Sequence, residues 1–216
     1  MHELLAVAAT SFIVGFSGAC TPGPLLFSVI VHSSERGFRA GPLNVLGHFV
    51  VEGSLAAALV AGLAALVAED LVKAVIGLVG GALLLFMGVD ILRYSRVASM
   101  ERLSEGRGSG LRRWGPVVMG AVTSVSNPFF ILWWVSVGNS LLLMGIQAAG
   151  LIGAAAVYLA HISSDLVWYS LVSLSVGAGR KLITDPVYKA ILAVCGALLT
   201  ILSLQFIYAG AKVLIG

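Results

Sequence analysis

Residues 114–164 decide the fold class, and they read WGPVVMGAVTSVSNPFFILWWVSVGNSLLLMGIQAAGLIGAAAVYLAHISS. This stretch contains no Asp, Glu, Lys or Arg. It is long enough for two membrane spans of about 20 residues each. Backbone exposed to lipid must satisfy its hydrogen bonds within its own segment, so we expect helices here rather than lone strands. The stretch therefore predicts an α-helical integral membrane protein.

The composition of the whole chain supports the same class. Hydrophobic residues make up 59% of the chain and charged residues 11%, and the mean hydropathy is +1.02. The apolar runs are much longer than the alternating strands of about 10 residues that form outer-membrane barrels. A net charge of +3 could suggest a nucleic-acid partner, but the basic residues lie in short loops. We therefore expect this protein to lie in a lipid bilayer and to bind no nucleic acid.

Nothing in the sequence indicates an enzyme. The two cysteines, Cys20 and Cys195, form no CxxC motif, and both lie in apolar runs. We expect both to be buried thiols that behave as small hydrophobic side chains. No ATP-binding fingerprint is present. We therefore predict neither a cofactor nor catalytic activity.

Six hydrophobic segments are separated by turn and charge signals. We predict membrane spans at 4–30, 43–67, 72–95, 115–138, 144–175 and 187–211. The connections between them are expected at 33–37, 69–70, 96–113, 138–140 and 179–186. The connection at 96–113 is rich in Gly and Ser, which is typical of a flexible linker.

The two halves of the chain carry matching motifs in the same order. VGGALLL at 79–85 returns as VCGALLT at 194–200. Two shorter motifs also recur: His48 with Glu52 matches His161 with Asp165, and Thr21-Pro22 matches Asn127-Pro128. A duplicated unit is a common origin of membrane transporters, whose site forms where the copies meet. We therefore expect a first repeat at 1–95, a linker at 96–113 and a second repeat at 114–216.

The basic residues predict how the protein lies in the membrane. Of the 13 Lys and Arg residues, all but Lys73 and Lys212 lie in or beside the first, third and fifth connections. Cytoplasmic loops carry the excess of Lys and Arg, so we expect both termini outside and the linker in the cytoplasm. Since each repeat has three spans, the second must enter the membrane from the opposite face. The predicted fold is an all-α integral membrane protein of six transmembrane helices in two inverted three-helix repeats.

Prolines interrupt the first and fourth spans at corresponding positions, which predicts two discontinuous helices. A proline lacks an N–H and clashes with the carbonyl four residues back, so the carbonyls of Gly18, Cys20 and Ser124 should be free. A freed carbonyl at membrane depth needs a partner, and a substrate or ion can be that partner. A kink without a binding role is the alternative. We predict that the substrate site includes Pro22, Gly23, Pro24, Asn127 and Pro128.

The second motif is a histidine with a carboxylate four residues later. This spacing puts His48 with Glu52, and His161 with Asp165, on one face of their helices, and Asn44 extends the first face by one turn. An intramembrane carboxylate costs about 2.5–3.5 kcal/mol, so it should face a cavity or a partner. Histidine changes its charge near neutral pH, which suits proton relay.

Three interpretations of these pairs stay open. The pairs could be hydrogen-bonded groups that tie helices together. They could couple protons or bind the ammonium group of a substrate, with Asn44 in the same site. Two imidazoles and two carboxylates could also converge into a site for a divalent ion. The choice depends on whether the two pairs converge.

Two further patterns concern packing. Trp133 and Trp134 are neighbours in the fourth span, and we expect at most one of them to line a cavity and touch substrate. Small-residue faces are formed by Gly77, Gly81, Gly88 and Gly196. These faces could meet within one chain or between two copies in a homodimer.

The segment Gly15-Phe-Ser-Gly-Ala-Cys-Thr-Pro-Gly-Pro24 resembles the lysine exporter superfamily of amino-acid efflux proteins. Members have a glycine-rich first helix ending in Pro-Gly-Pro and an Asn-Pro element that opens the second half, matched here by Asn127-Pro128-Phe129-Phe130. The six-span pattern and the polar linker extend the resemblance over nearly the whole chain. It implies export of amino acids or related small zwitterions across the cytoplasmic membrane, driven by protons. It also implies that the substrate lies near Pro22–Pro24 and Asn127–Pro128.

The paired histidines and carboxylates depart from this resemblance. Most amino-acid exporters do not carry them, whereas wider relatives of the superfamily export divalent cations. We therefore keep divalent metal-ion export through His48, Glu52, His161 and Asp165 as the alternative. A membrane thiol-redox family with a similar repeat needs a cysteine beside the proline in each half. Cys20 fits that pattern, but Ser126 and Asn127 stand where the second cysteine would be.

Overall fold

The computed structural model describes residues 2–21, 23–63, 69–99, 110–179 and 184–215, and its regular structure is entirely helical over those residues. In chain order the helices are α1 (His2–Ala19), α2 (Pro24–Arg36), α3 (Ala40–Ala58), η1 (Leu59–Leu63), α5 (Asp70–Val97), α7 (Gly110–Val125), α8 (Pro128–Trp133), η2 (Trp134–Gly138), α9 (Asn139–Gly179) and α10 (Asp185–Ile215). The two η elements are π-helical turns that continue α3 and α8.

By length and composition, five helical stretches within the described residues can cross a membrane. They are His2–Ala19, Ala40–Gly62, Asp70–Val97, Pro128–Gly179 and Asp185–Leu214, and Trp114–Val125 is a shorter apolar helix. Large apolar side chains are widely exposed on their surfaces; Leu151, for example, is 74% exposed. Such surfaces are unfavourable in water and suited to lipid. The protein is therefore a multi-pass membrane protein.

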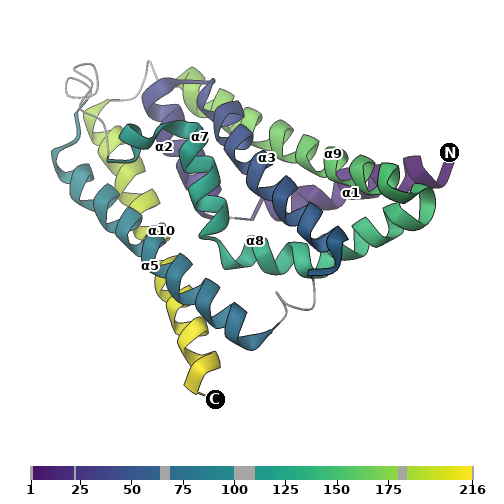
Figure 1. The fold of residues 1–216 in the computed structure, drawn as a ribbon. Helices are drawn as coiled ribbons and strands as arrows, with labels where there is room; N and C mark the ends of the chain where they lie inside the picture. The colour runs from purple at the N-terminus through teal and green to yellow at the C-terminus, as the bar shows by residue number, and fades with distance from the viewer. Residues whose placement is uncertain (1, 22, 64–68, 100–109, 180–183, 216) are drawn as a thin grey trace.

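The helix ends gather at two opposite ends of the molecule. In Figure 1, α2, α5 and α9 end, and α3, α7 and α10 begin, toward the upper left. On the other side, the N-terminal end of α1 lies at the far right, η1 lies right of the centre and the C-terminal end of α10 lies at the bottom. Exposed basic side chains mark the first end, which we call the basic end: Arg36, Arg39, Arg93, Arg96 and Lys189.

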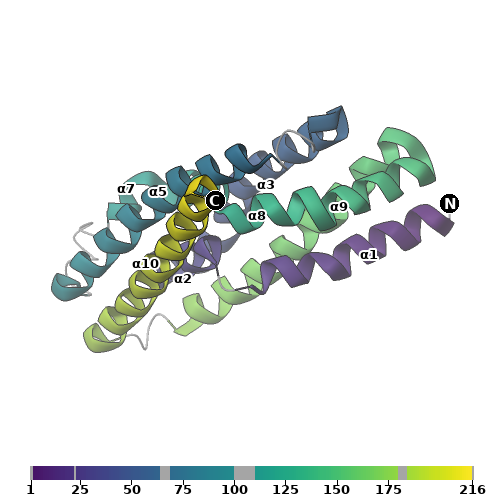
Figure 2. The same cartoon turned by 90° about the horizontal axis from the view of Figure 1, so that it is seen from below.

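Helices of the two halves pack against each other in pairs. α1 packs against α9, α7 against α3, and α5 against α10 (Figures 1 and 2). Glycines allow the close approach. A Cβ at Gly47 of α3 would overlap the Val117 carbonyl of α7, and a Cβ at Gly120 would overlap the Asn44 carbonyl in return. The backbones of α3 and α7 therefore touch directly at the level of Asn44 and His48.

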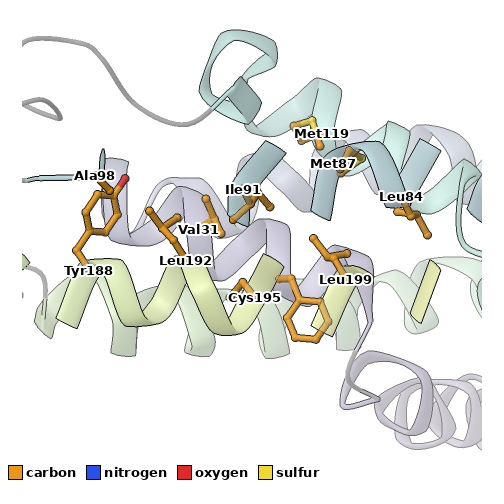
Figure 3. Close-up of a cluster of buried hydrophobic side chains, with 11 residues drawn as sticks. Val31, Leu84, Met87, Ile91, Ala98, Met119, Tyr188, Leu192, Cys195 and Leu199 are labelled. Atoms are coloured by element: carbon orange, nitrogen blue, oxygen red, sulfur yellow. The ribbon is translucent and has the colours of Figure 1, made fainter. Parts of the chain in front are cut away.

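The largest buried apolar cluster fills the space between α5, α10, α2 and α7 (Figure 3). It includes Leu84, Met87, Ile91, Met119, Tyr188, Leu192, Cys195 and Leu199. Along the same contact, Gly77, Gly81 and Gly88 approach α10 near Gly210, Ser203 and Gly196, respectively. The small-residue faces therefore meet within one chain.

The expected burial of the two cysteine thiols is confirmed for Cys195 and wrong for Cys20, which is exposed just after α1.

The predicted turn at 138–140 is wrong. The helix runs without a break from η2 into α9, and the hydroxyls of Ser136 and Ser140 donate to carbonyls one turn back within it, at 2.7 and 2.9 Å. The chain reverses instead at Ala149 and Gly150, where Gly150 has φ +59°. The long helical stretch after Pro128 is therefore two antiparallel segments, at 128–148 and 151–179.

The predicted connection at 33–37 is right only at its end. α2 continues through Arg36, and Gly37, with φ +78°, ends it. Ser33, Ser34 and Glu35 are buried rather than exposed. The Ser33 hydroxyl lies 2.7 Å from that of Ser173 on α9, so a neighbouring helix supplies its hydrogen-bond partner. Glu35 therefore places a buried carboxylate in the last turn of α2.

Candidate functional site

Both predicted helix breaks are present, and they lie beside each other. α1 ends at Ala19 and α2 begins at Pro24, while α7 ends at Val125 and α8 begins at Pro128. A Cβ built on Gly23 would lie only 3.8 Å from the Asn127 side-chain nitrogen. The breaks come from different halves of the chain, so the two halves lie next to each other at this point.

The expectation of free carbonyls at the breaks is wrong for Gly18 and Ser124. The N–H of Thr21 donates to the Gly18 carbonyl at 3.1 Å, and the N–H of Asn127 donates to the Ser124 carbonyl at 3.1 Å. In each half, the residue directly before the proline closes a tighter, 3₁₀-type turn and uses the carbonyl that proline leaves. These two carbonyls are therefore not available to a ligand.

The two histidine–carboxylate pairs converge into one cluster, which we call the quartet: His48 and Glu52 of α3 with His161 and Asp165 of α9. All four side chains are buried. The His48 Nε2 atom lies 3.3 Å from Glu52 Oε1 and 3.4 Å from Asp165 Oδ2. The His161 Nε2 atom lies 3.1 Å from Glu52 Oε1 and 3.7 Å from Asp165 Oδ2. Each imidazole thus faces the carboxylates of both halves.

Hydrogen bonds fix where His48 holds one of its protons. The Ser124 hydroxyl donates its proton to the Gly120 carbonyl at 2.6 Å, so its oxygen accepts from His48 Nδ1–H at 2.7 Å. The Nε2 atom therefore faces Glu52 and Asp165 with either a lone pair or a second proton. A lone pair against two carboxylates would be repulsive. A proton must therefore lie between them, on His48 Nε2 or on a carboxylate oxygen, or a metal cation must lie there.

Glu52 connects the quartet to Trp134 of η2. Its Oε1 accepts a hydrogen bond from Trp134 Nε1–H at 3.0 Å, in addition to its two imidazole contacts. Its Oε2 has no hydrogen-bond partner among the described residues, nor has His161 Nδ1. Two carboxylates and two neutral imidazoles carry two net negative charges. In a buried site this charge must be balanced, by two protons or by one divalent cation.

The quartet lines a cavity of about 50 Å³ between the two breaks. That volume has room for a few water molecules, so anything larger enters only if the helices move apart. Gly18, Ala19 and Leu25 contribute from the first break. The second half contributes polar and aromatic side chains: Ser124, Asn127, Phe129, Phe130, Trp133, Trp134 and Tyr169.

The prediction that at most one of Trp133 and Trp134 lines a cavity is wrong. Both rings line it, and both pack on His161, with ring centroids 4.6 and 5.1 Å apart, respectively. Neighbouring helix positions point about 100° apart rather than to opposite sides, so two neighbours can border one cavity.

The remaining predicted site residues do not all line the cavity. Pro22 lies outside the described residues, and Pro24 is buried at the start of α2. Pro128 begins α8, whose first turn is capped by Asn127 through a 3.1 Å bond from Phe129 N–H. Asn44 does not line the cavity. Its side chain accepts from the Ser28 hydroxyl at 2.7 Å and donates to the Ala40 carbonyl at 2.8 Å.

Several residues that line the cavity were not among the predicted site residues, and the polar or aromatic side chains of Ser124, Trp134 and Tyr169 are three of them. Ser124 precedes Pro128 by four residues, so it lies one turn before the break on the same side of the helix. That spacing is a signal that could have identified it. Nothing in the sequence sets Trp134 apart from Trp133, or marks Tyr169 as a cavity residue.

Comparison with known proteins agrees with this geometry. The model of the family described as "LysE type translocator" matches residues 16–210 of this chain. YcgF of Bacillus subtilis (strain 168), a candidate amino acid efflux protein by its name, is 24% identical over 205 residues, which cover 94% of this chain and 96% of YcgF. The chemotactic transduction protein ChpE of Pseudomonas aeruginosa is 27% identical over 138 residues, 64% of this chain and 66% of ChpE.

No solved structure matches the chain at a significant level. The family match nevertheless covers most of the sequence, including both breaks and all four quartet residues. The chain belongs to the LysE type translocator family, and it is a membrane transporter rather than an enzyme.

Proposed function

We propose that this protein exports amino acids or related small zwitterions across the cytoplasmic membrane in exchange for protons. The observation that carries the proposal is the quartet, in which two buried carboxylates and two imidazoles from both halves face one another beside two helix breaks. The family supplies the transport activity, and the name of YcgF supports amino acids as the substrate class.

The quartet suits an exchange mechanism because substrate and protons compete for the same charges. When the imidazoles lose their extra protons, the two carboxylates can take the ammonium group of a zwitterion, with Trp133 and Trp134 around it. The positive N-terminal end of α2 suits the substrate carboxylate. When protons return, they displace the ammonium group. Export of substrate is thereby coupled to proton entry.

We also propose the predicted topology for this exchange. Six spans form two inverted repeats, at 1–95 and 114–216, with a cytoplasmic linker at 96–113, most of which lies outside the described residues. The reciprocal packing of α1 on α9 and of α7 on α3 supports this arrangement. Gathering of exposed basic side chains at one end supports placing that end in the cytoplasm and both termini outside.

Transport into inverted membrane vesicles tests the proposal. We expect vesicles with an acidic lumen to accumulate tritiated amino acids when they contain the wild-type protein. Glu52→Gln and Asp165→Asn should lose this accumulation, whereas Ser54→Ala, an exposed position on the same helix, should keep it. The proposal fails if the wild type accumulates no amino acid, or if both carboxylate variants accumulate as the wild type does.

Divalent metal-ion export is the second candidate, and the donor set favours it specifically. Ligand atoms of His48, Glu52 and Asp165 all lie within 4.8 Å of one another, and His161 adds a second imidazole. Nitrogen and oxygen ligands of this kind suit divalent first-row metals, and one divalent ion would balance the two carboxylates.

The same vesicles separate the two candidates when labelled manganese and zinc are offered beside the amino acids. Metal export predicts uptake of a labelled cation. It also predicts that the cation raises the melting temperature of the wild type and that this rise is lost in both His48→Ala and His161→Ala. Amino-acid export predicts neither result.

A further inference from the structure

Half-helix α2 buries a row of polar and titratable side chains that the proposed exchange does not use. Ser28, His32 and Glu35 are 1%, 0% and 2% exposed. Their spacing of four and three residues puts them on one face of the helix. Burial of an imidazole and a carboxylate is costly, and apolar side chains would pack at these positions more cheaply. The row therefore calls for an explanation other than packing.

One end of the row lies close to the quartet. The Ser28 hydroxyl donates to the Asn44 side-chain oxygen at 2.7 Å. Asn44 precedes His48 by one turn on the same face of α3. Leu25, one turn before Ser28 on α2, lines the cavity itself. The polar row thus begins one helical turn from the charged site.

His32, in the middle of the row, has a defined tautomer. Its Nδ1 atom lies 2.9 Å from the Ser28 carbonyl oxygen, which only accepts hydrogen bonds, so Nδ1–H is the donor. The Nε2 atom is therefore the one that can gain and release a proton. Histidine is the side chain whose ordinary chemistry allows this near neutral pH.

The other end of the row reaches the basic end of the molecule. Glu35 Oε1 accepts a hydrogen bond from the Tyr188 hydroxyl at 2.9 Å, and Tyr188 lies in the first turn of α10 (Figure 3). Tyr94 of α5 packs against the same buried cluster that contains Tyr188. The next residue, Arg36, is exposed.

We propose that His32 and Glu35 carry protons between the quartet and the basic end of the protein. This inference rests on the proposed proton coupling and names its inner path. A proton arriving from the quartet side binds His32 Nε2, passes through a bridging water molecule to a Glu35 carboxylate oxygen, and leaves to water beyond α2. Each step moves one proton between lone pairs and changes no oxidation state. His32 is neutral again after the transfer, and Glu35 regains its negative charge when it releases the proton.

Two transport modes distinguish this role from a structural one. Exchange of amino acid for amino acid requires no net proton movement, whereas accumulation driven by a pH gradient does. Both can be measured in proteoliposomes with purified protein and a mixture of tritiated amino acids. Glu35→Gln keeps an oxygen that accepts from Tyr188 but cannot carry a proton. Tyr188→Phe removes that hydrogen bond and leaves the carboxylate.

We expect Glu35→Gln and His32→Gln to keep exchange within about twofold of the wild type and to lose about tenfold or more of the gradient-driven accumulation. Tyr188→Phe should keep both activities. If the Glu35–Tyr188 bond is only a latch between α2 and α10, Tyr188→Phe loses both activities and Glu35→Gln keeps both, which overturns the proposal.

The proposal also fails if Glu35→Gln and His32→Gln lose exchange together with accumulation, because the residues would then be needed for substrate movement itself. Normal accumulation in these variants likewise overturns the relay and leaves the proposed function standing. A wild-type protein that exchanges amino acids but ignores the pH gradient refutes the proposed coupling instead. The two failures are therefore distinguishable.

Discussion

Substitution of Gly47 by alanine tests the close contact on which the quartet is built. A Cβ at this position would overlap the Val117 carbonyl oxygen and lie 2.8 Å from the Ala121 backbone nitrogen. Both obstacles are backbone atoms of α7, so no side-chain rotation can remove them. α3 and α7 must separate by more than about 1 Å to accept the new methyl group.

The structure sets the size of the effect. His48 follows Gly47, and its 2.7 Å bond to Ser124 crosses the same contact, so a shift of this size breaks it. Overpacking costs about 1–3 kcal/mol. The lost hydrogen bond adds about 0.5–1.5 kcal/mol. Alanine regains about 1 kcal/mol through its higher helix propensity. We expect a net loss of about 2 kcal/mol in the free energy of unfolding.

Titration with sodium dodecyl sulfate in mixed micelles measures this free energy. Gly18→Ala is the matched control, because the nearest atoms to its Cβ belong to the Trp133 side chain, 3.8 Å away. This control should be as stable as the wild type or up to about 1 kcal/mol more stable. Equal unfolding free energies for Gly47→Ala and Gly18→Ala would refute the direct contact between α3 and α7.

Three further predictions use the same titration. Trp134→Phe removes the hydrogen-bond donor to Glu52 and should lower the free energy of unfolding by about 1.5–3 kcal/mol. Trp133→Phe should cost less, because no hydrogen bond from the Trp133 indole is found among the described residues. Equal losses in the two variants would contradict the hydrogen bond from Trp134 to Glu52. Asn127→Ala should cost about 0.5–2 kcal/mol through loss of the α8 cap, and Asn127→Asp should retain most of it. Gly150→Ala should cost roughly 1–2 kcal/mol because of its φ of +59°, and an unchanged variant would speak against the chain reversal there.

The helical class and both breaks could be predicted because lipid permits few alternatives. A long stretch without charge must form helices at membrane depth, and a proline in the middle of such a stretch removes a backbone hydrogen bond, as at 22–24 and at Pro128. The spacing of four residues also predicted correctly which side chains share a helix face. Convergence of His48 and His161 required the packing of α3 against α9, which joins residues far apart in sequence.

The two misplaced connections have a common physical cause. Ser33-Ser34 and Gly138-Asn139-Ser140 suggest turns in a soluble protein, where Ser and Asn side chains compete with the helix for backbone N–H and C=O groups. At membrane depth no water competes, and the hydroxyls of Ser34, Ser136 and Ser140 bond to carbonyls of their own helix. The burial of Glu35 was missed for a different reason, because its partner Tyr188 lies in the opposite half of the chain.

The most direct test of the account is a double-mutant cycle between Glu52 and His161, which lie 3.1 Å apart on different halves of the chain. The unfolding free energies of Glu52→Gln, His161→Gln and the double variant give the coupling energy. Glu52→Gln with the remote Tyr188→Phe serves as the additive control. If the two halves share one charged cluster, the Glu52–His161 coupling should be about 1–3 kcal/mol. Additivity of this pair, within the error of the control, would contradict the account.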